Sequence, residues 1–145
     1  ANWPLTLSRD GTRTPMPWKA EAPNCGFSSQ TPWLPLGGDH VALAVDKQEE
    51  SEHSMLQATR RFIALRQANE ALRSGDIHIV DAQGPILAFE RKSEHQTILC
   101  LFNMGGQSVN WTPDNSEQWR TIEQLNAARD WKIGSYGALV AERMI

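Results

Sequence analysis

The sequence predicts a mainly β fold in which one long helix precedes an antiparallel β-sandwich. Three features predict it: a proline-rich stretch over residues 1–48, helical periodicity over residues 51–75, and alternation of apolar and polar residues from position 76 onward. Short strands that are separated by turns, with no helices between them, are typical of antiparallel sandwiches. The second half of the chain is therefore expected to form one β-domain.

The first segment is expected to be mostly loop. Residues 1–48 hold six of the eight prolines in the chain. Proline fixes φ and lacks the backbone donor, so this density opposes helices and strand ladders. A loop of this length is unusual in a compact domain and tends to be functional or to belong to a larger structure. Its tryptophans would need a surface to pack against; they are Trp3, Trp18 and Trp33.

A helix is expected over residues 51–75. Ser54, with Gln57 three residues later, resembles a capping box. Asn69 could cap a short second helix that ends at Gly75. A stripe at helical spacing consists of Met55, Leu56, Thr59, Phe62, Ile63 and Arg66. We expect the apolar members of this stripe to lie in the core, and the alternative that they face an absent domain stays open.

Strands are expected over residues 77–80, 86–91, 97–103, 108–111, 119–122 and 138–143. The segment 97–103 is apolar at nearly every residue, which predicts a central strand with Cys100 as a small core residue. Turns are predicted at residues 82–85 and 105–106, where glycine and proline interrupt the pattern.

Composition excludes several classes of function. The formal net charge of -3 comes with no basic face of the kind that binds nucleic acid. No apolar run approaches the roughly 20 residues that span a membrane, and the first residues lack a signal-peptide pattern. The 145 residues also fall far short of the roughly 250 of a complete (β/α)8 barrel. The two cysteines, Cys25 and Cys100, are not spaced as a metal or redox motif, so free thiols in the cytoplasm are the simplest expectation.

The usual catalytic motifs do not occur. The four histidines are not paired at metal-ligand spacing. There is no G-x-S-x-G elbow and no glycine-rich phosphate loop. Glu49, Glu50 and Glu52 precede a helix, where negative charge suits its N-terminal dipole, and we prefer this reading to a catalytic carboxylate pair. The sequence predicts no catalytic residue, no metal site and no cofactor.

Residues 8–18 have a composition that suits a carbohydrate site. Arg9, Asp10 and Arg13 stand beside a proline-rigidified turn that ends at Trp18. Arginine offers several donors in a fixed fork, and tryptophan offers a flat apolar face, which together match the surfaces of a sugar. The alternative is an Arg–Asp pair that pins the loop.

The stretch of residues 8–18, SRDGTRTPMPW, resembles a signature of α-glucosidases, oligo-1,6-glucosidases and trehalose synthases in glycoside hydrolase family thirteen, part of the α-amylase superfamily. Further matching blocks follow in order at residues 24–27, 31–34, 45–48, 54–56, 61–66 and 71–75. The resemblance is strong over the first half of the chain, and the second half matches only in strand pattern.

The resemblance implies an architecture and an activity. Residues 1–75 would be the last loop and the last helix of a (β/α)8 barrel that is otherwise missing, and residues 76–145 would be the C-terminal antiparallel β-domain. The parent enzyme would hydrolyse terminal α-linked glucose from short oligosaccharides by a retaining mechanism. That mechanism needs two carboxylates about 5 Å apart, which the family carries upstream of this segment. The chain by itself is therefore expected to be inactive and mainly structural.

The resemblance assigns one substrate-binding residue. The arginine before Thr-Pro-Met, which is Arg13 here, would bind the glucose at the non-reducing end of an α-glucoside oligosaccharide. Arg9 and Asp10 would shape the loop, and Trp18 and Phe27 would belong to its rim. Cys25 stands where the family usually has Ala or Gly, and a partly exposed thiol there could be reactive.

Two other interpretations remain open. The chain could be a free-standing carbohydrate-binding or protein-interaction module, in which case two or more of Trp111, Trp119 and Trp131 should lie side by side on an exposed face. It could also be a subunit that completes a split barrel. If a barrel is missing, the apolar stripe of Met55, Leu56, Phe62 and Ile63 should promote self-association.

Overall fold

The computed structural model describes residues 10–127 and 130–144. The chain forms two compact units, residues 1–60 and residues 61–145. The division falls inside helix α2 (Met55–Ala68). The predicted boundary at residues 75 and 76 concerns the origin of the two segments and stays a prediction. Trp3 and Arg9, both singled out in the sequence, lie outside the described residues.

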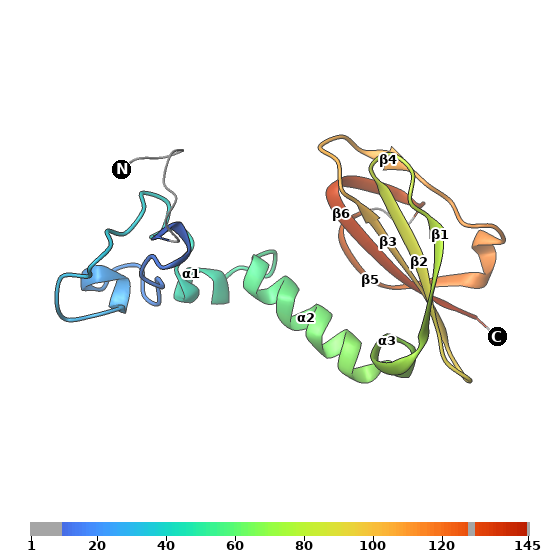
Figure 1. Ribbon diagram of the computed structural model, residues 1–145, viewed down its shortest axis with the longest axis horizontal. Coiled ribbons are helices and arrows are strands. Elements are labelled where there is room, and N and C mark those ends of the chain that lie inside the picture. Colours follow the sequence, from blue (N-terminus) through green and yellow to red (C-terminus); the bar gives the residue numbers. More distant parts are fainter. Residues whose placement is uncertain (1–9, 128–129, 145) are drawn as a thin grey trace. The chain divides into compact units, whose positions relative to one another are not determined.

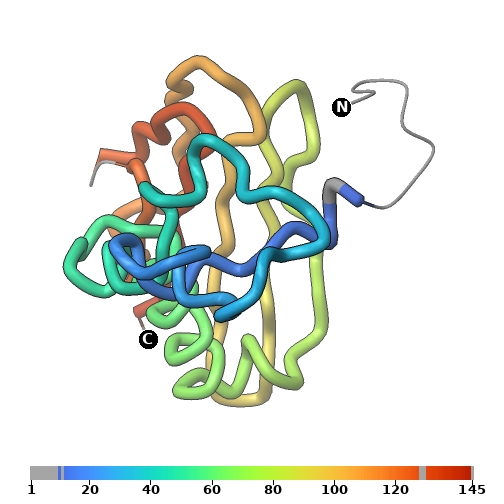
Figure 2. Tube along the Cα trace, turned by 90° about the vertical axis from the view of Figure 1, so that its left-hand side faces the viewer, coloured from blue at the N-terminus to red at the C-terminus, as the bar shows by residue number. Residues whose placement is uncertain are grey.

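The first unit is mostly loop, as the prolines predict. Its regular elements are two short 3-10 helices, η1 (Asp10–Thr12) and η2 (Pro23–Gly26), and one short α-helix, α1 (Val45–Glu49). Figure 2 shows this segment, in blue to cyan, as a succession of turns. Because it has no strand ladder among its described residues, its backbone must be held by turns and side chains.

Helix α2 begins as predicted at a serine cap. The amide of Gln57 donates to Ser54 Oγ at 3.2 Å. The side chain of Gln57 does not return to Ser54, however, but donates to the carbonyl of Glu49 at 3.2 Å. Only half of the capping box is therefore present. A second free amide of the helix, that of Leu56, donates to Gln48 Oε1 at 3.1 Å.

The charged residues around α2 interact with each other. Arg60 donates to both carboxylate oxygens of Glu49 at 2.6 Å, and this hydrogen bonding lowers the pKa of Glu49. Both groups are exposed, so the pair adds little to stability. Its geometry ties α1 to α2 within the first unit.

The second unit is a six-stranded antiparallel sheet (Figure 1). Its strands are β1 (Asp76–Asp81), β2 (Ile86–Lys92), β3 (Thr97–Asn103), β4 (Val109–Asn110), β5 (Trp119–Ala127) and β6 (Lys132–Arg143). The order is β1-β2-β3-β6-β4, with β5 also paired to β6. The predicted strands and the central place of 97–103 are confirmed. All six strands share one hydrogen-bonded sheet among the described residues, and the arrangement of a sandwich stays a prediction.

The sheet folds back on itself at a bulge in β6. Leu125 pairs with Ala138, whereas Ala127 pairs with Ile133, so several residues of β6 lie opposite Asn126. A Cβ on Gly137 would lie 2.5 Å from the carbonyl oxygen of Asn126, which explains the need for glycine. Because of this bend, the beginning of β6 and the short strand β4 close over one face of the sheet.

The centre of the sheet is buried on both faces, whereas the edge strand β1 is mostly exposed. One core contains Leu99, Leu101, Leu139 and Ile133, and the other contains Ile98, Cys100 and Val140. The alternation along β3 follows from the period of two in a strand. Helix α3 (Glu70–Ser74) adds Ala71 and Leu72 to the second core. Cys100 is a core residue as predicted, and burial raises the pKa of its thiol to about 11.

The helical stripe contributes less to the core than its periodicity predicts. Phe62 and Leu65 pack against the second core, but Ile63 is 54% exposed. Met55, at the first turn of α2, is 68% exposed. The prediction of a core position is therefore wrong for Met55 and Ile63. Within the second unit, Phe62 and Leu65 are the residues of α2 that pack against the second core, and Ile63 lies between them in sequence without joining it.

The end of α3 also differs from the prediction. Gly75 has an extended backbone, with φ of -65° and ψ of 156°, and not the left-handed conformation of a common helix cap. Glycine is needed here for close approach instead, because a Cβ would lie 2.6 Å from the carbonyl oxygen of Ala71. Asn69 occupies the N-cap position, but its side chain donates to the carbonyl of Leu65 and makes no capping bond.

The buried side chain of Asn103 should be important for stability. Its amide donates to the carbonyl oxygens of Gln107 at 2.7 Å and Gly134 at 2.8 Å, and its oxygen accepts from the amide of Gly105 at 2.9 Å. We expect Asn103→Ala to lower the free energy of unfolding by roughly 2–3 kcal/mol, because buried backbone groups lose their partners. Equilibrium unfolding in urea measures the free energy of unfolding of the unmodified chain and of the variant. The control is Asn110→Ala, at an exposed position of β4, and equal losses in the two variants would contradict the assignment.

Candidate functional site

The proline-rich loop is held around residues 17–20. The amides of Trp18 and Lys19 both donate to the carbonyl oxygen of Cys25, at 2.9 and 3.0 Å. On the other side of this segment, the amide of Val45 donates to the carbonyl oxygen of Pro17 at 2.9 Å, and the amide of Asp46 donates to the carbonyl oxygen of Trp18 at 3.2 Å. Residues 17–20 are thus held by backbone hydrogen bonds to η2 on one side and to the start of α1 on the other.

The carboxylate of Asp46 completes this arrangement. Both of its oxygens accept from the amide of Ala20, each at 3.1 Å, across 26 positions of sequence. One oxygen also accepts from the amide of Lys47 at 2.8 Å. We call the contacts of residues 17–20 with Cys25, Val45 and Asp46 the Asp46 clamp. Hydrogen bonds to a charged acceptor are stronger than those between neutral groups.

The turn that carries Cys25 has an unusual backbone. Asn24, Cys25 and Gly26 have φ values of 51°, 51° and 72°. The left-handed region costs a non-glycine residue of order 1–3 kcal/mol. The turn is secured by the Asn24 side chain, which donates to the carbonyls of Ser28 and Gln30 at 2.9 and 3.0 Å. It directs the carbonyl of Cys25 to the two amides of the clamp.

The prediction of a partly exposed Cys25 is wrong. The residue is only 3% exposed, because the left-handed turn brings it inside the loop, where Ala20 and Ala44 are also buried. Thiolate reactivity requires access, so Cys25 is not a reactive thiol in this conformation.

Arg13 lies just after η1 with an exposed side chain. Its backbone amide donates to the carbonyl oxygen of Asp10 at 3.0 Å. In residues 10–127 and 130–144, no hydrogen bond or ion pair involves the Arg13 guanidinium. A side-chain pair between Arg13 and Asp10 is therefore not seen, whereas Arg9, the other arginine of this alternative, lies outside the described residues. An exposed guanidinium on a loop that is fixed elsewhere can serve as a donor to a ligand.

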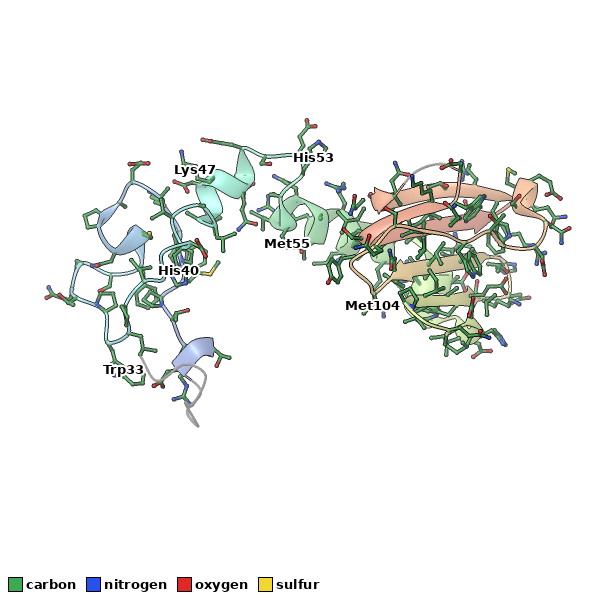
Figure 3. The ribbon with its side chains drawn as sticks, turned by 90° about the horizontal axis from the view of Figure 1, so that it is seen from above. Trp33, His40, Lys47, His53, Met55 and Met104 are labelled. Carbon is green, nitrogen blue, oxygen red and sulfur yellow. The ribbon has the colours of Figure 1, made fainter. Side chains whose placement is uncertain are left out.

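The same loop exposes several large apolar side chains. Trp18 and Phe27, predicted for the rim, are both about half exposed, and Figure 3 shows Trp33 at the periphery of its loop. Met16 is exposed as well. Arg13 and these residues offer the combination of planar donors and flat apolar surfaces that sugars bind. Their roles as site residues remain predictions.

The described residues include no group of three His, Cys, Asp or Glu side chains that could hold a metal ion. They also contain no helix that is both long enough and apolar enough to cross a membrane.

Comparison with known proteins decides the family. Residues 2–75 match the family described as the α-amylase catalytic domain. The chain belongs to the α-amylase family. A probable α-glucosidase of Rhizobium meliloti (strain 1021) is 45% identical over 107 residues, which is 74% of this chain and 19% of that protein. A trehalose-6-phosphate hydrolase of Escherichia coli (strain K12) is 30% identical over 72% of this chain and 19% of that protein.

Solved structures of family members extend the similarity over more than nine tenths of the chain. The α-glucosyl transfer enzyme XgtA has a TM-score of 0.84 and 36% identity, covering 97% of this chain and 27% of its own. The isomaltulose synthase PalI of Klebsiella sp. LX3 has a TM-score of 0.82 and 25% identity, covering 93% of this chain and 26% of its own. The antiparallel sheet, expected from strand pattern alone, thus has counterparts in this family. The chain spans about a fifth of the length of the curated relatives that it matches.

The sequence offered no role for Asp46, which the structure shows to be central to the loop. Asp46 lies in the matching block at residues 45–48, and the sequence alone assigned no function to it. The available signal was an acidic residue in the first turn of a short helix, a position that favours acceptors. Its partner, Ala20, has no recognisable feature in sequence.

Proposed function

We propose that this chain is the C-terminal part of a retaining α-glucosidase that hydrolyses terminal α-linked glucose from short oligosaccharides. The observation that carries the proposal is the 45% identity with the probable α-glucosidase of Rhizobium meliloti over 74% of this chain. Within the chain, Arg13 donates hydrogen bonds to the glucose at the non-reducing end. Its exposed guanidinium, which has no partner among the described residues, supports this role.

The chemistry of the proposed parent needs groups beyond this segment. A retaining glycosidase uses one carboxylate as nucleophile and a second, about 5 Å away, as acid and base. Here Glu49 is engaged by Arg60, and Glu142 by Gln96 and Arg120. The resemblance of residues 8–18 to the family signature implies that the catalytic carboxylates lie outside this segment, and on that ground we propose that the chain alone has no hydrolytic activity. Its two free cysteines support a cytoplasmic location for the parent.

Glucosyl transfer is the second candidate function. It is favoured by the 36% identity with XgtA, a transfer enzyme, over 97% of this chain. Transfer and hydrolysis share the covalent glucosyl intermediate and differ in whether a sugar hydroxyl or water attacks it. The free-standing module is less well supported. Trp119 is only 8% exposed, and Trp111 and Trp131 pack against the same core, so the three do not form an exposed row.

A chimera tests the role of Arg13. Residues 1–145 replace the matching segment of the Rhizobium meliloti protein, and hydrolysis of p-nitrophenyl α-glucoside is measured. We expect an active chimera in which Arg13→Ala lowers kcat/KM by roughly 100-fold or more, because one or two charge-assisted hydrogen bonds are worth about 1.5–3 kcal/mol each. Arg13→Lys should recover part of the loss, since it keeps the charge without the fork.

Lys47→Ala is the matched control for that experiment, because it also removes an exposed positive charge from the first unit. An Arg13→Ala chimera with activity within about threefold of the unmodified chimera would refute the assignment. Product analysis with maltose as substrate separates hydrolysis, whose only product is glucose, from transfer, which releases one glucose per maltose cleaved and moves the other onto an acceptor sugar to give longer sugars. The 145-residue chain alone should show no turnover.

We also propose that the chain self-associates through the exposed side of α2. Ile63 is an exposed apolar residue there, and such surfaces recruit partners. Sedimentation velocity over a range of concentrations should show reversible association that Ile63→Glu abolishes. Gln67→Glu, which adds the same charge at another exposed position of α2, should leave it unchanged. A monodisperse monomer at high concentration would rule out the proposal.

A further inference from the structure

A hollow of about 360 Å³ lies on one face of the sheet, in the unit of residues 61–145. Pockets of roughly 300–1,000 Å³ are the size class that binds small molecules. Its lining combines the sheet residues Glu90, Leu99, Trp119 and Arg143 with the loop of residues 111–115. The hollow therefore lies between the sheet and the segment that leads from β4 to the 3-10 helix η3 (Ser116–Gln118).

Arg143 is held in place at this hollow. Its guanidinium carbon lies 5.5 Å from the centroid of the Trp119 ring, and one N–H group donates to Gln118 Oε1 at 3.2 Å. Stacking on an indole ring orients the planar guanidinium. No other hydrogen bond of this guanidinium is found in the part of the chain that the structure describes. Its remaining donors are available for a ligand.

Trp111 forms a second fixed wall. Its indole N–H donates to Asp81 Oδ2 at 2.8 Å, which locks the orientation of the ring. The ring packs against the core of Leu99 and Trp119 and is partly exposed where it lines the hollow. A flat apolar surface with a fixed orientation is well suited to the C–H face of a sugar ring.

The carboxylate of Glu90 supplies hydrogen-bond acceptors at the hollow. Its side chain is 17% exposed, and within residues 10–127 and 130–144 its one ion pair is with Lys92, whose amino group lies 2.6 Å from one carboxylate oxygen. The second carboxylate oxygen has no partner among the described residues. Across the sheet, Glu90 pairs with Leu99, so the carboxylate lies beside the apolar floor of the hollow.

The charges of the hollow favour a neutral ligand. Arg143 is positive, Asp114 is negative, and Glu90 is balanced by Lys92. An anion would lie close to two carboxylates, and a cation would lie close to the guanidinium, so burial of either would be costly. A neutral molecule with both hydroxyl donors and acceptors can use Glu90 and Arg143 together.

We infer that this hollow binds a single pyranose ring of a neutral sugar. The ring lies against Trp111, donates a hydroxyl hydrogen to Glu90 and accepts hydrogen bonds from the Arg143 guanidinium. The inference goes beyond the proposed function, because it concerns the second unit and does not involve Arg13.

The test uses NMR spectroscopy of the 145-residue chain during titration with maltose and isomaltose. We expect shifts of the indole N–H signals of Trp111 and Trp119, with an affinity near the millimolar range. Glu90→Gln and Arg143→Lys, which keep the size or the charge of the side chain, should each weaken binding at least tenfold. Inorganic phosphate should leave the two indole signals unchanged.

Two controls separate this site from the first unit. Arg13→Ala and Trp33→Ala should bind the sugars as the unmodified chain does. The inference is overturned if neither sugar shifts the Trp111 and Trp119 signals at roughly 20 mM, well above the expected affinity. It is also overturned if binding survives both Glu90→Gln and Arg143→Lys. If Arg13→Ala alone abolishes binding, the sugar binds at Arg13, which supports the proposed function and refutes this inference.

Discussion

The carboxylate of Asp46 is the interaction on which the first unit depends. A loop rich in proline lacks many backbone donors and forms no ladder among its described residues, so a few hydrogen bonds must fix it. Both carboxylate oxygens of Asp46 accept hydrogen bonds from the amide of Ala20. The carbonyl oxygen of Cys25 accepts hydrogen bonds from the amides of Trp18 and Lys19. Because the backbone is held from within, Arg13 and the aromatic residues of the loop can remain exposed. This is the arrangement that a ligand-binding loop on a larger scaffold requires.

The second unit depends on apolar packing against both faces of its central strand. Its central strand β3 is buried on both faces, with Ile98 and Cys100 on one side and Leu99 and Leu101 on the other. The bulge opposite Asn126 bends β6, and Asn103 ties the bent strand back to the end of β3. A single sheet can thus close over its own face, and the hollow beside Trp111 lies where this closure ends.

Much of the second unit could be predicted from sequence, because strand alternation is a local signal. The six strands and the central position of β3 follow from patterns of a few residues, as does the cap at Ser54 in the first unit. The exposure of Met55 and Ile63 could not be predicted, since periodicity shows which side of a helix is apolar and not what covers it. The contact of Asp46 with Ala20 spans 26 positions of sequence, and the bulge in β6 depends on how that strand pairs with β5, so neither has a signature within its own segment. The family was identified from the resemblance of residues 8–18 to a known signature. From their physical chemistry alone, the same residues could form either a carbohydrate site or an Arg–Asp pair that pins the loop.

The most direct test of this account is backbone hydrogen exchange at residues 18–20 and 45–46 in the 145-residue chain. If the Asp46 clamp holds the loop, the amides of Trp18, Lys19 and Ala20 exchange much more slowly than in an unstructured peptide. Asp46→Ala should remove the protection of Ala20 while the amides of β3 stay protected. Exchange of Ala20 at the peptide rate in the unmodified chain, or equal protection in Asp46→Ala, would contradict the account.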